Sequence, residues 1–503
     1  MTTFSYQFTK GPWTGKSTFP TGIFIDNEFV ESNSTIDVVN PSTGQLITKI
    51  SEAKLEHVDI AVKAAQRAFD TTWGLNASGE TRQQLLYDLA TLMERDADEL
   101  ASLEALDNGK TFSWARGTDV ASSISTIKYY AGWASKIHGS TIETDERKFA
   151  YVRKEPKGAF IWALWCASYR GTSQPLLMMA WKIGPALAAG CTVLLKPSEF
   201  TPLTALRMCS LIKEAGFPPG VVNVLVGYGP TTGQALSEHM GISKVAFTGS
   251  TLVGRKIMAA ASKSNLKDVT LELGGKSPNV IFDDADLDQA VSWAAHGIFW
   301  NHGQACCAGS RIFVQAGIYD RFLAALTEKA KAIRVGDPFD PNVDQGPQVS
   351  QLQYDRIMGY IDSGRKDGAT VHLGGNRIGT EGYFIEPTIF TDTRPDMKIV
   401  EEEIFGPVGV VVKFTDEQDV IRQANDTLYG LAAAVFTKDI TKAIETAHKL
   451  HAGTVWVNCV NQLHVQIPFG GYKQSGIGRE LGENALDNYL NVKAVHINLG
   501  HTM

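Results

Sequence analysis

Short apolar runs alternate with stretches of helical periodicity through the middle of the chain. Residues 192–196, 221–226, 245–248 and 269–273 are such runs, and buried parallel strands have this composition. Helical patterns over about 201–216, 231–239 and 254–262 separate them. Strands that alternate with helices in this way predict a doubly wound α/β sheet.

A second unit of the same kind begins after residue 278. Residues 279–282 form another apolar run, and residues 286–299 have an apolar helical face. That face consists of Leu287, Ala290, Val291, Ala294 and Ile298. Further α/β units extend to about residue 458, so we expect a separate α/β domain here. Upstream, residues 55–110 and about 120–134 predict helices.

The last part of the chain predicts a short helix from residue 485 and a strand over 492–499. A terminal strand outside a complete domain often pairs with a neighbouring subunit. We therefore expect at least a dimer.

Composition places the chain among ordinary globular proteins. Its 503 residues are 44% hydrophobic and 20% charged, with a net charge of −7. This length predicts two to four domains, at about 150 residues each. The acidic balance and the lack of a long Lys/Arg run argue against a nucleic-acid partner. Lys182, Pro185 and glycines interrupt the most apolar stretch, which predicts buried core rather than a membrane span.

The cysteines do not predict a disulfide framework, because they are few and irregularly spaced. They are Cys166, Cys191, Cys209, Cys306, Cys307 and Cys459. No apolar leader is visible at the N-terminus, so we expect a reducing, cytoplasmic location, with a mitochondrial one still open. His302 and Cys306 alone are a weak metal signal, and no metal site is predicted.

Two glycine-rich turns lie at strand-to-helix junctions, Gly227 to Gly233 and Gly249 to Gly254. Gly permits close backbone approach there, and a helix N-terminus offers free N–H groups to a phosphate. Neither turn matches G-x-G-x-x-G, so each is also explained as a plain turn. Lys196 and Glu199 follow the first strand, where they could hold a ribose. The alternative is a surface ion pair.

Three further residues could carry chemistry. Cys306 follows a helix and a loop, where nearby helix N–H groups can lower the pKa of a thiol and make it a nucleophile. The alternative is a small buried hydrophobe. Glu272 ends an apolar strand, where burial would raise its pKa toward a general-base range. The alternative is a solvated strand end, and Glu403 has the same ambiguity.

Taken together, these motifs resemble the NAD(P)-dependent aldehyde dehydrogenase superfamily, and most closely its broad-specificity cytosolic and mitochondrial type. The segments that carry the resemblance are Phe247-Thr-Gly-Ser-Thr251, Leu271-Glu-Leu-Gly-Gly-Lys-Ser-Pro-Asn279, Gly303-Gln-Ala-Cys-Cys-Ala-Gly-Ser-Arg311, Glu402-Glu-Ile-Phe-Gly-Pro407, Gly453-Thr-Val-Trp-Val-Asn458 and Pro468-Phe-Gly-Gly-Tyr-Lys473. The likeness extends from about residue 24 to residue 499.

The resemblance implies two doubly wound α/β domains and a small β arm. Residues 1–137 and 156–272 would form a discontinuous NAD-binding domain, and residues 273–484 a catalytic domain. A hairpin around 138–155 and residues 485–503 would form the oligomerisation arm of a homodimer or homotetramer.

The resemblance also assigns roles to residues. Cys306 would attack the aldehyde to form a thiohemiacetal and then a thioester, which water activated by Glu272 would hydrolyse. The cofactor-binding residues would be Lys196, Glu199, Gly229, Gly249, Ser250, Leu273, Glu403 and Phe405. Trp181, Leu463 and Phe469 would line the aldehyde tunnel. Glu199 favours NAD, because a carboxylate repels a 2′-phosphate. Transfer of the thioester to coenzyme A is a rival reading, against which the water-activating Glu272 argues.

The stretch between Gly158 and Pro175 departs from the family pattern. The family carries there an Asn, whose side chain stabilises the oxyanion, followed by an aromatic residue. In this chain Ser173 takes the Asn position and Gln174 the aromatic one. Losing one such donor typically costs about 10²–10³ in turnover. A shifted reading frame, a misplaced splice boundary and real divergence are all open origins. A catalytically impaired NAD-binding protein is therefore the alternative function.

Overall fold

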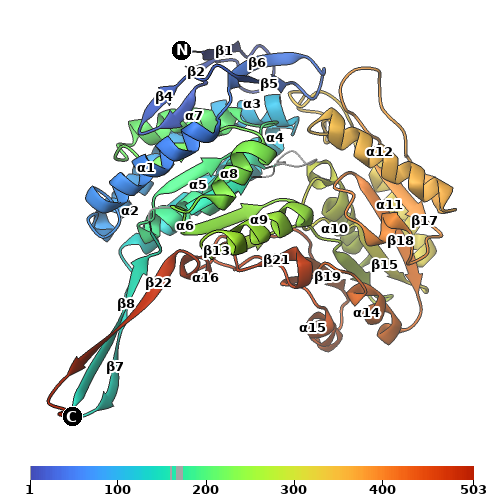
Figure 1. Cartoon of the computed structure of the whole chain (residues 1–503). Helices are drawn as coiled ribbons and strands as arrows, with labels where there is room; N and C mark the ends of the chain where they lie inside the picture. Colours follow the sequence, from blue (N-terminus) through green and yellow to red (C-terminus); the bar gives the residue numbers. More distant parts are fainter. Residues whose placement is uncertain (1, 159–160, 166–173) are drawn as a thin grey trace.

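The computed structural model describes residues 2–158, 161–165 and 174–503, and within them the chain builds two large sheets (Figure 1). The first has the strand order β21-β13-β12-β9-β10-β11-β3-β4. Its strands are β3 (Ile23–Ile25), β4 (Glu28–Val30), β9 (Ile161–Trp165), β10 (Val193–Lys196), β11 (Val222–Val224), β12 (Lys244–Thr248), β13 (Asp268–Glu272) and β21 (Gly476–Ile477). From β13 to β11 the neighbouring strands are parallel, as a doubly wound sheet requires.

Helices cover both faces of this sheet. Along β10, Val193 and Leu195 share a core with one set of helices, whereas Leu194 shares a core with the other. The first set is α2 (Gly79–Arg95), α5 (Ala121–Ala134), α6 (Pro175–Ala189) and α7 (Leu203–Glu214), and the second is α1 (Leu55–Thr71), α8 (Gln234–Glu238) and α9 (Thr251–Lys263). The apolar runs predicted as strands correspond to β10 through β13, so that prediction is confirmed. β9 and β21 were not predicted.

The second large sheet has the order β16-β17-β18-β15-β14-β19-β20. Its strands are β14 (Pro278–Ile281), β15 (Arg311–Gln315), β16 (Thr370–Leu373), β17 (Thr388–Thr391), β18 (Val408–Phe414), β19 (Ala432–Phe436) and β20 (Thr454–Val457). The helices around it are α10 (Leu287–Phe299), α11 (Tyr319–Lys331), α12 (Gln351–Lys366), α14 (Glu417–Asn425) and α15 (Ile440–Lys449). The predicted second α/β unit is thus present, and the expected fold class is confirmed.

A separate three-stranded antiparallel sheet extends away from the body (Figure 1). It joins β7 (Ser140–Asp145) and β8 (Lys148–Pro156) to β22 (Leu490–Asn498). The predicted hairpin and the predicted terminal strand therefore lie in one sheet. Val492 and Ile497 of β22 are 70% and 41% exposed, which leaves apolar surface on this sheet.

Shorter elements complete the described chain. They are β1 (Thr3–Gln7), β2 (Lys16–Pro20), β5 (Thr35–Val39), β6 (Leu46–Ser51), α3 (Ala97–Asn108), α4 (Phe112–Trp114), η1 (Ala115–Val120), η2 (Gly229–Gly233), η3 (Trp300–Gly303), α13 (Lys398–Glu401), η4 (Lys473–Ser475) and α16 (Asn484–Asp487). The element η1 is a π-helical turn, a form that is frequent at functional sites. No helix among the described residues has the length and apolar character needed to cross a membrane.

Candidate active site

A tight loop carries Cys306 toward the end of β13. Asn301, His302 and Gly303 all have left-handed backbone conformations, with φ of 52°, 59° and 69°. Gly303 is required here, because a Cβ at this position would lie 2.0 Å from the carbonyl oxygen of Gly406. The loop therefore packs directly on the segment that follows Glu403.

Glu272 is the last residue of β13 and its side chain is buried, with 2% of the residue exposed. Burial raises its pKa to about 8, and the neighbouring Cys306 side chain partly offsets the rise. The buried ion pair of Lys182 and Glu480 acts on the same carboxyl, Lys182 lowering the pKa and Glu480 raising it. The alternative of a solvated strand end is therefore wrong, and Glu272 has the pKa of a general base.

The Cys306 thiol does not have the lowered pKa that its loop position suggested. The adjacent Cys307 side chain, burial and the negative charge of Glu272 together raise the pKa of Cys306 well above its ordinary value. The expectation was wrong because it considered helix N–H groups and not the neighbouring carboxyl. A thiol of this kind needs a neighbouring group to take its proton before it can act as a nucleophile, and Glu272 is the adjacent carboxyl.

Glu403 and Gly274 fit together at the start of the second unit. Glu403 is buried, and a Cβ on Gly274 would lie 1.7 Å from its Oε2 atom. Phe405 has a φ of +60°, and the Gln353 side chain donates to its carbonyl oxygen at 2.8 Å. The absence of a side chain at Gly274 therefore leaves the space that the Glu403 carboxylate occupies.

A cavity of about 580 Å³ lies beside α8 and α9 at the first sheet. Glu199 and Gly229 line it. Lys196 is fully buried, donates to the carbonyl oxygens of Pro197 and Gly227, and lies 3.6 Å from Oε2 of Glu199. The surface ion pair is therefore the wrong alternative. Oε2 of Glu199 accepts no hydrogen bond from any described residue, so it can accept one from a ligand hydroxyl.

Three other residues predicted to bind the cofactor lie outside the lining of this cavity: Gly249 and Ser250 in the turn before α9, and Leu273 directly after β13. The Gly249 N–H donates to the Glu272 carbonyl oxygen at 3.0 Å, and Ser250 caps α9 by accepting from the Val253 N–H at 3.4 Å. Leu273 packs against Gly254, where a Cβ would lie 2.9 Å from its side chain. These contacts join the N-terminus of α9 to the strand that carries Glu272.

A second cavity has a volume of about 630 Å³, and Trp181 and Leu463 line it, as predicted. Phe469, also predicted there, is not among its lining residues and packs edge-on against Trp181 with ring centroids 5.6 Å apart. Asn461 in the lining accepts a hydrogen bond from the Cys307 thiol at 3.3 Å, which places the cavity beside the nucleophile loop.

Sequence reasoning missed most of the aromatic lining of the 630 Å³ cavity. Trp114, Trp293, His296 and Trp300 all contribute to it. Three of them recur at positions 293, 296 and 300, which share one face of a helix. This spacing predicts an aromatic helical face, but only the opposite, aliphatic face of α10 was recognised from the sequence.

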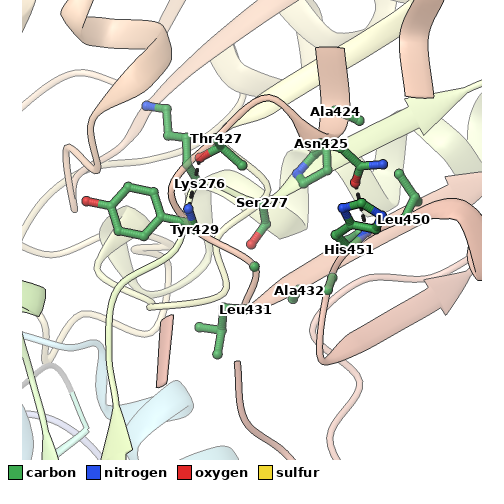
Figure 2. A pocket seen from close by; sticks show the side chains of 14 residues that line it. Lys276, Ser277, Ala424, Asn425, Thr427, Tyr429, Leu431, Ala432, Leu450 and His451 are labelled. Carbon is green, nitrogen blue, oxygen red and sulfur yellow. Dashed lines mark hydrogen bonds between the residues drawn. The ribbon is translucent and has the colours of Figure 1, made fainter. Parts of the chain in front are cut away.

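A third, very small cavity lies against the second sheet (Figure 2). Its volume is about 10 Å³, which is room for roughly one water molecule. Lys276 lines it and donates to the Ile399 carbonyl oxygen, while Asn425 accepts from the His451 N–H. It is too small for a substrate.

The last two expectations from the sequence concern His302 and the segment between Gly158 and Pro175. Burial lowers the pKa of His302 to about 3, and its Nε2 atom accepts from the Gly346 N–H, so it supports the loop as a neutral side chain. No metal-binding group of His, Cys, Asp or Glu is found in the described part of the chain. Ser173 lies outside the described residues, whereas Gln174 precedes α6 and lines the 630 Å³ cavity.

The two α/β units and the buried Glu272 carboxyl beside Cys306 fit an enzyme that works through a cysteine. The model of the aldehyde dehydrogenase family matches residues 29–495, and the chain belongs to that family.

Individual relatives agree. An aldehyde dehydrogenase of Agaricus bisporus is 67% identical over 99% of both chains, and aldehyde dehydrogenase 1A1 of Mesocricetus auratus is 52% identical over 95% of both. An NAD⁺ complex of an aldehyde dehydrogenase from Bacillus cereus superposes with a TM-score of 0.93, at 47% identity over 96% of this chain and 97% of that one. Nothing in these findings supports the catalytically impaired alternative.

Proposed function

We propose that this protein catalyses the NAD-dependent oxidation of aldehydes to carboxylates. The observation that carries the proposal is the contact between Cys306 and the buried carboxyl of Glu272, whose pKa of about 8 suits a general base. Membership of the aldehyde dehydrogenase family supports it.

The reaction proceeds on the Cys306 sulfur. Glu272 takes the thiol proton, and the thiolate attacks the aldehyde carbon to give a thiohemiacetal. Loss of a hydride from that carbon leaves a thioester. Glu272 then releases the thiol proton to solvent and takes a proton from water, and the resulting hydroxide attacks the thioester carbon. The C–S bond breaks, the acid passes its proton to the Cys306 sulfur, and the carboxylate leaves; Glu272 releases its second proton to solvent. The same buried carboxyl serves both proton transfers.

NAD supplies the hydride acceptor when it is bound, and the residues present fit it. Glu199 offers a buried oxygen without a hydrogen-bond donor among the described residues, which suits a ribose hydroxyl and disfavours a 2′-phosphate. Lys196 and Gly229 adjoin the same cavity wall. Gly249 and Ser250, at the N-terminus of α9, would hold the pyrophosphate.

The nicotinamide end would be held at the nucleophile loop. Glu403 would bind the nicotinamide ribose, and Phe405 and Leu273 would pack beside the ring. The backbone N–H of Cys306 would be one donor to the oxyanion of the substrate. Trp181 and Leu463 would guide the aldehyde, with Phe469 supporting Trp181 from behind.

We assign cofactor binding to residues 1–137 and 156–272, catalysis to residues 273–484, and subunit contact to residues 138–155 and 485–503. The exposed apolar residues of β22 support a homodimer or homotetramer, because such surface is ordinarily covered. We propose a cytoplasmic location, and fractionation of cells against a mitochondrial marker tests it.

The test is NADH formation by the purified chain with acetaldehyde, a longer aliphatic aldehyde and an aromatic one. Cys306→Ser is expected to abolish NADH formation while leaving saturable NAD binding. Cys459→Ser, at a partly buried cysteine outside the site, is the matched control. Full activity in Cys306→Ser would refute the proposed mechanism.

A further inference from the structure

One wall of the 630 Å³ cavity is a cluster of four aromatic rings. The ring of His296 lies at its centre, with centroids 5.8 Å from Trp114, 5.8 Å from Trp293 and 5.9 Å from Trp300. Trp114 and Trp300 are 6.1 Å apart and nearly perpendicular. Edge-to-face and tilted contacts at these distances are the favourable ones for aromatic rings. A further planar ring in the cavity can join this cluster.

Hydroxyl groups form another part of the same lining. Thr118, Ser122, Ser125 and Thr126 lie on η1 and α5, at a spacing that places them on one helical face. Thr126 already donates to the Ser122 carbonyl oxygen, whereas the hydroxyls of Ser122 and Ser125 bond to no other described residue. These two hydroxyls can form hydrogen bonds with a polar substituent on a bound ring.

No Asp, Glu, Lys or Arg occurs among the described residues that line this cavity. Burial lowers the pKa of His296 below its ordinary value, so its ring is neutral at pH 7. A carboxylate moved from water into such a lining loses hydration and meets no Lys or Arg side chain among the described lining residues. The cavity therefore disfavours aldehydes that carry a carboxylate.

We propose that this cavity selects uncharged aromatic aldehydes whose ring carries hydroxyl or ether oxygens, with His296, Ser122 and Ser125 as the specificity-determining residues. The inference rests on the proposed function and names the substrate class of the same site. The volume of about 630 Å³ leaves room for a substituted ring, since ligand sites of this kind span about 300–1,000 Å³.

The first arm of the test compares kcat/KM within matched pairs of aldehydes. Benzaldehyde is expected to exceed cyclohexanecarbaldehyde by roughly 2- to 13-fold, which corresponds to one aromatic contact. 3-Hydroxybenzaldehyde, whose phenol stays protonated at neutral pH, is expected to exceed benzaldehyde, and 4-carboxybenzaldehyde to fall below it. Equal rates for the planar and saturated rings would overturn the proposal. So would a preference for betaine aldehyde, whose quaternary ammonium group the rings could hold by cation–π contact.

The second arm assigns the selectivity to residues. His296→Leu is expected to lower kcat/KM for benzaldehyde by roughly 2- to 13-fold and to leave acetaldehyde within twofold. The double variant Ser122→Ala, Ser125→Ala is expected to remove the advantage of the hydroxylated ring over benzaldehyde. Gln289→Leu, an exposed position of α10 outside the cavity, is the control for substitution in that helix.

Acetaldehyde and a binding measurement separate this inference from the proposed function. If acetaldehyde is oxidised but rings are not preferred, the inference fails and the function stands. If no aldehyde is oxidised, the function fails, and calorimetric titration of Cys306→Ser still decides the inference. Tighter binding of 4-hydroxybenzyl alcohol than of cyclohexylmethanol supports the ring-selective cavity, and equal binding overturns it.

Discussion

Replacing Glu272 with glutamine should stabilise the fold at alkaline pH while removing activity. In the folded protein burial holds the pKa of this carboxyl at about 8, against 4.5 for an exposed glutamate. Between these pH values the folded state keeps a proton that the unfolded state has lost. The free energy of unfolding therefore falls as pH rises from about 4.5 to 8, and the fall is complete above 8.

The magnitude follows from the same two pKa values. At about 1.4 kcal/mol for each pKa unit, the difference between 4.5 and about 8 corresponds to about 5 kcal/mol. Glu272→Gln has no such charge to bury, so its stability relative to the original chain should rise across this pH range. Thermal unfolding at pH 5 and pH 9 measures the change. Glu381→Gln, at an exposed position, is the control.

The pH dependence of kcat gives an independent measure of the pKa of Glu272. Where hydrolysis of the thioester limits turnover, log kcat should rise with pH at a slope of up to one and level off above about pH 8, because only the carboxylate can accept the proton. A stability difference that is the same at pH 5 and pH 9, or a kcat that is already level at pH 6, would refute the buried general base.

Three further outcomes are expected. Gly274→Ala should weaken NAD binding roughly 10- to 100-fold, because its Cβ would displace the Glu403 carboxylate. Titration with NAD measures this change. Gly359→Ala is the control that should leave NAD binding unchanged, because its Cβ would meet nothing within 4 Å. Lys110→Met should lower the free energy of unfolding by about 3–5 kcal/mol by leaving the buried Asp119 unpaired, and denaturant titration measures it. Truncation after residue 489, which removes β22, should reduce the sedimentation coefficient to that of a monomer.

The strand pattern of the sequence was sufficient for the core of the fold. Apolar runs such as 193–196 fix both the strand and its burial, and period-two alternation sends Leu194 and Leu195 to opposite faces. β21 could not be predicted in the same way, because Gly476 and Ile477 form a strand only through their pairing with β13.

The candidate site was predictable by residue type but not by environment. Motifs identified Cys306 and Glu272, yet their pKa values depend on groups that meet only in the folded chain. Glu480 acts on Glu272 from more than 200 positions away, and Glu272 itself raises the pKa of Cys306. The aromatic wall was visible in the spacing of Trp293, His296 and Trp300, but its contact with Trp114 required the structure.

The pairing of β13 with β21 also bears on the synthesis of the chain. Glu272 pairs with Gly476, so about 200 residues must be added after the strand has formed before its edge is covered. At roughly 5–20 residues per second, that interval is about 10–40 s on the ribosome. During it β13 presents open backbone groups to other nascent chains. The strand that ends in Glu272 is thus completed only after nearly the whole chain has been made.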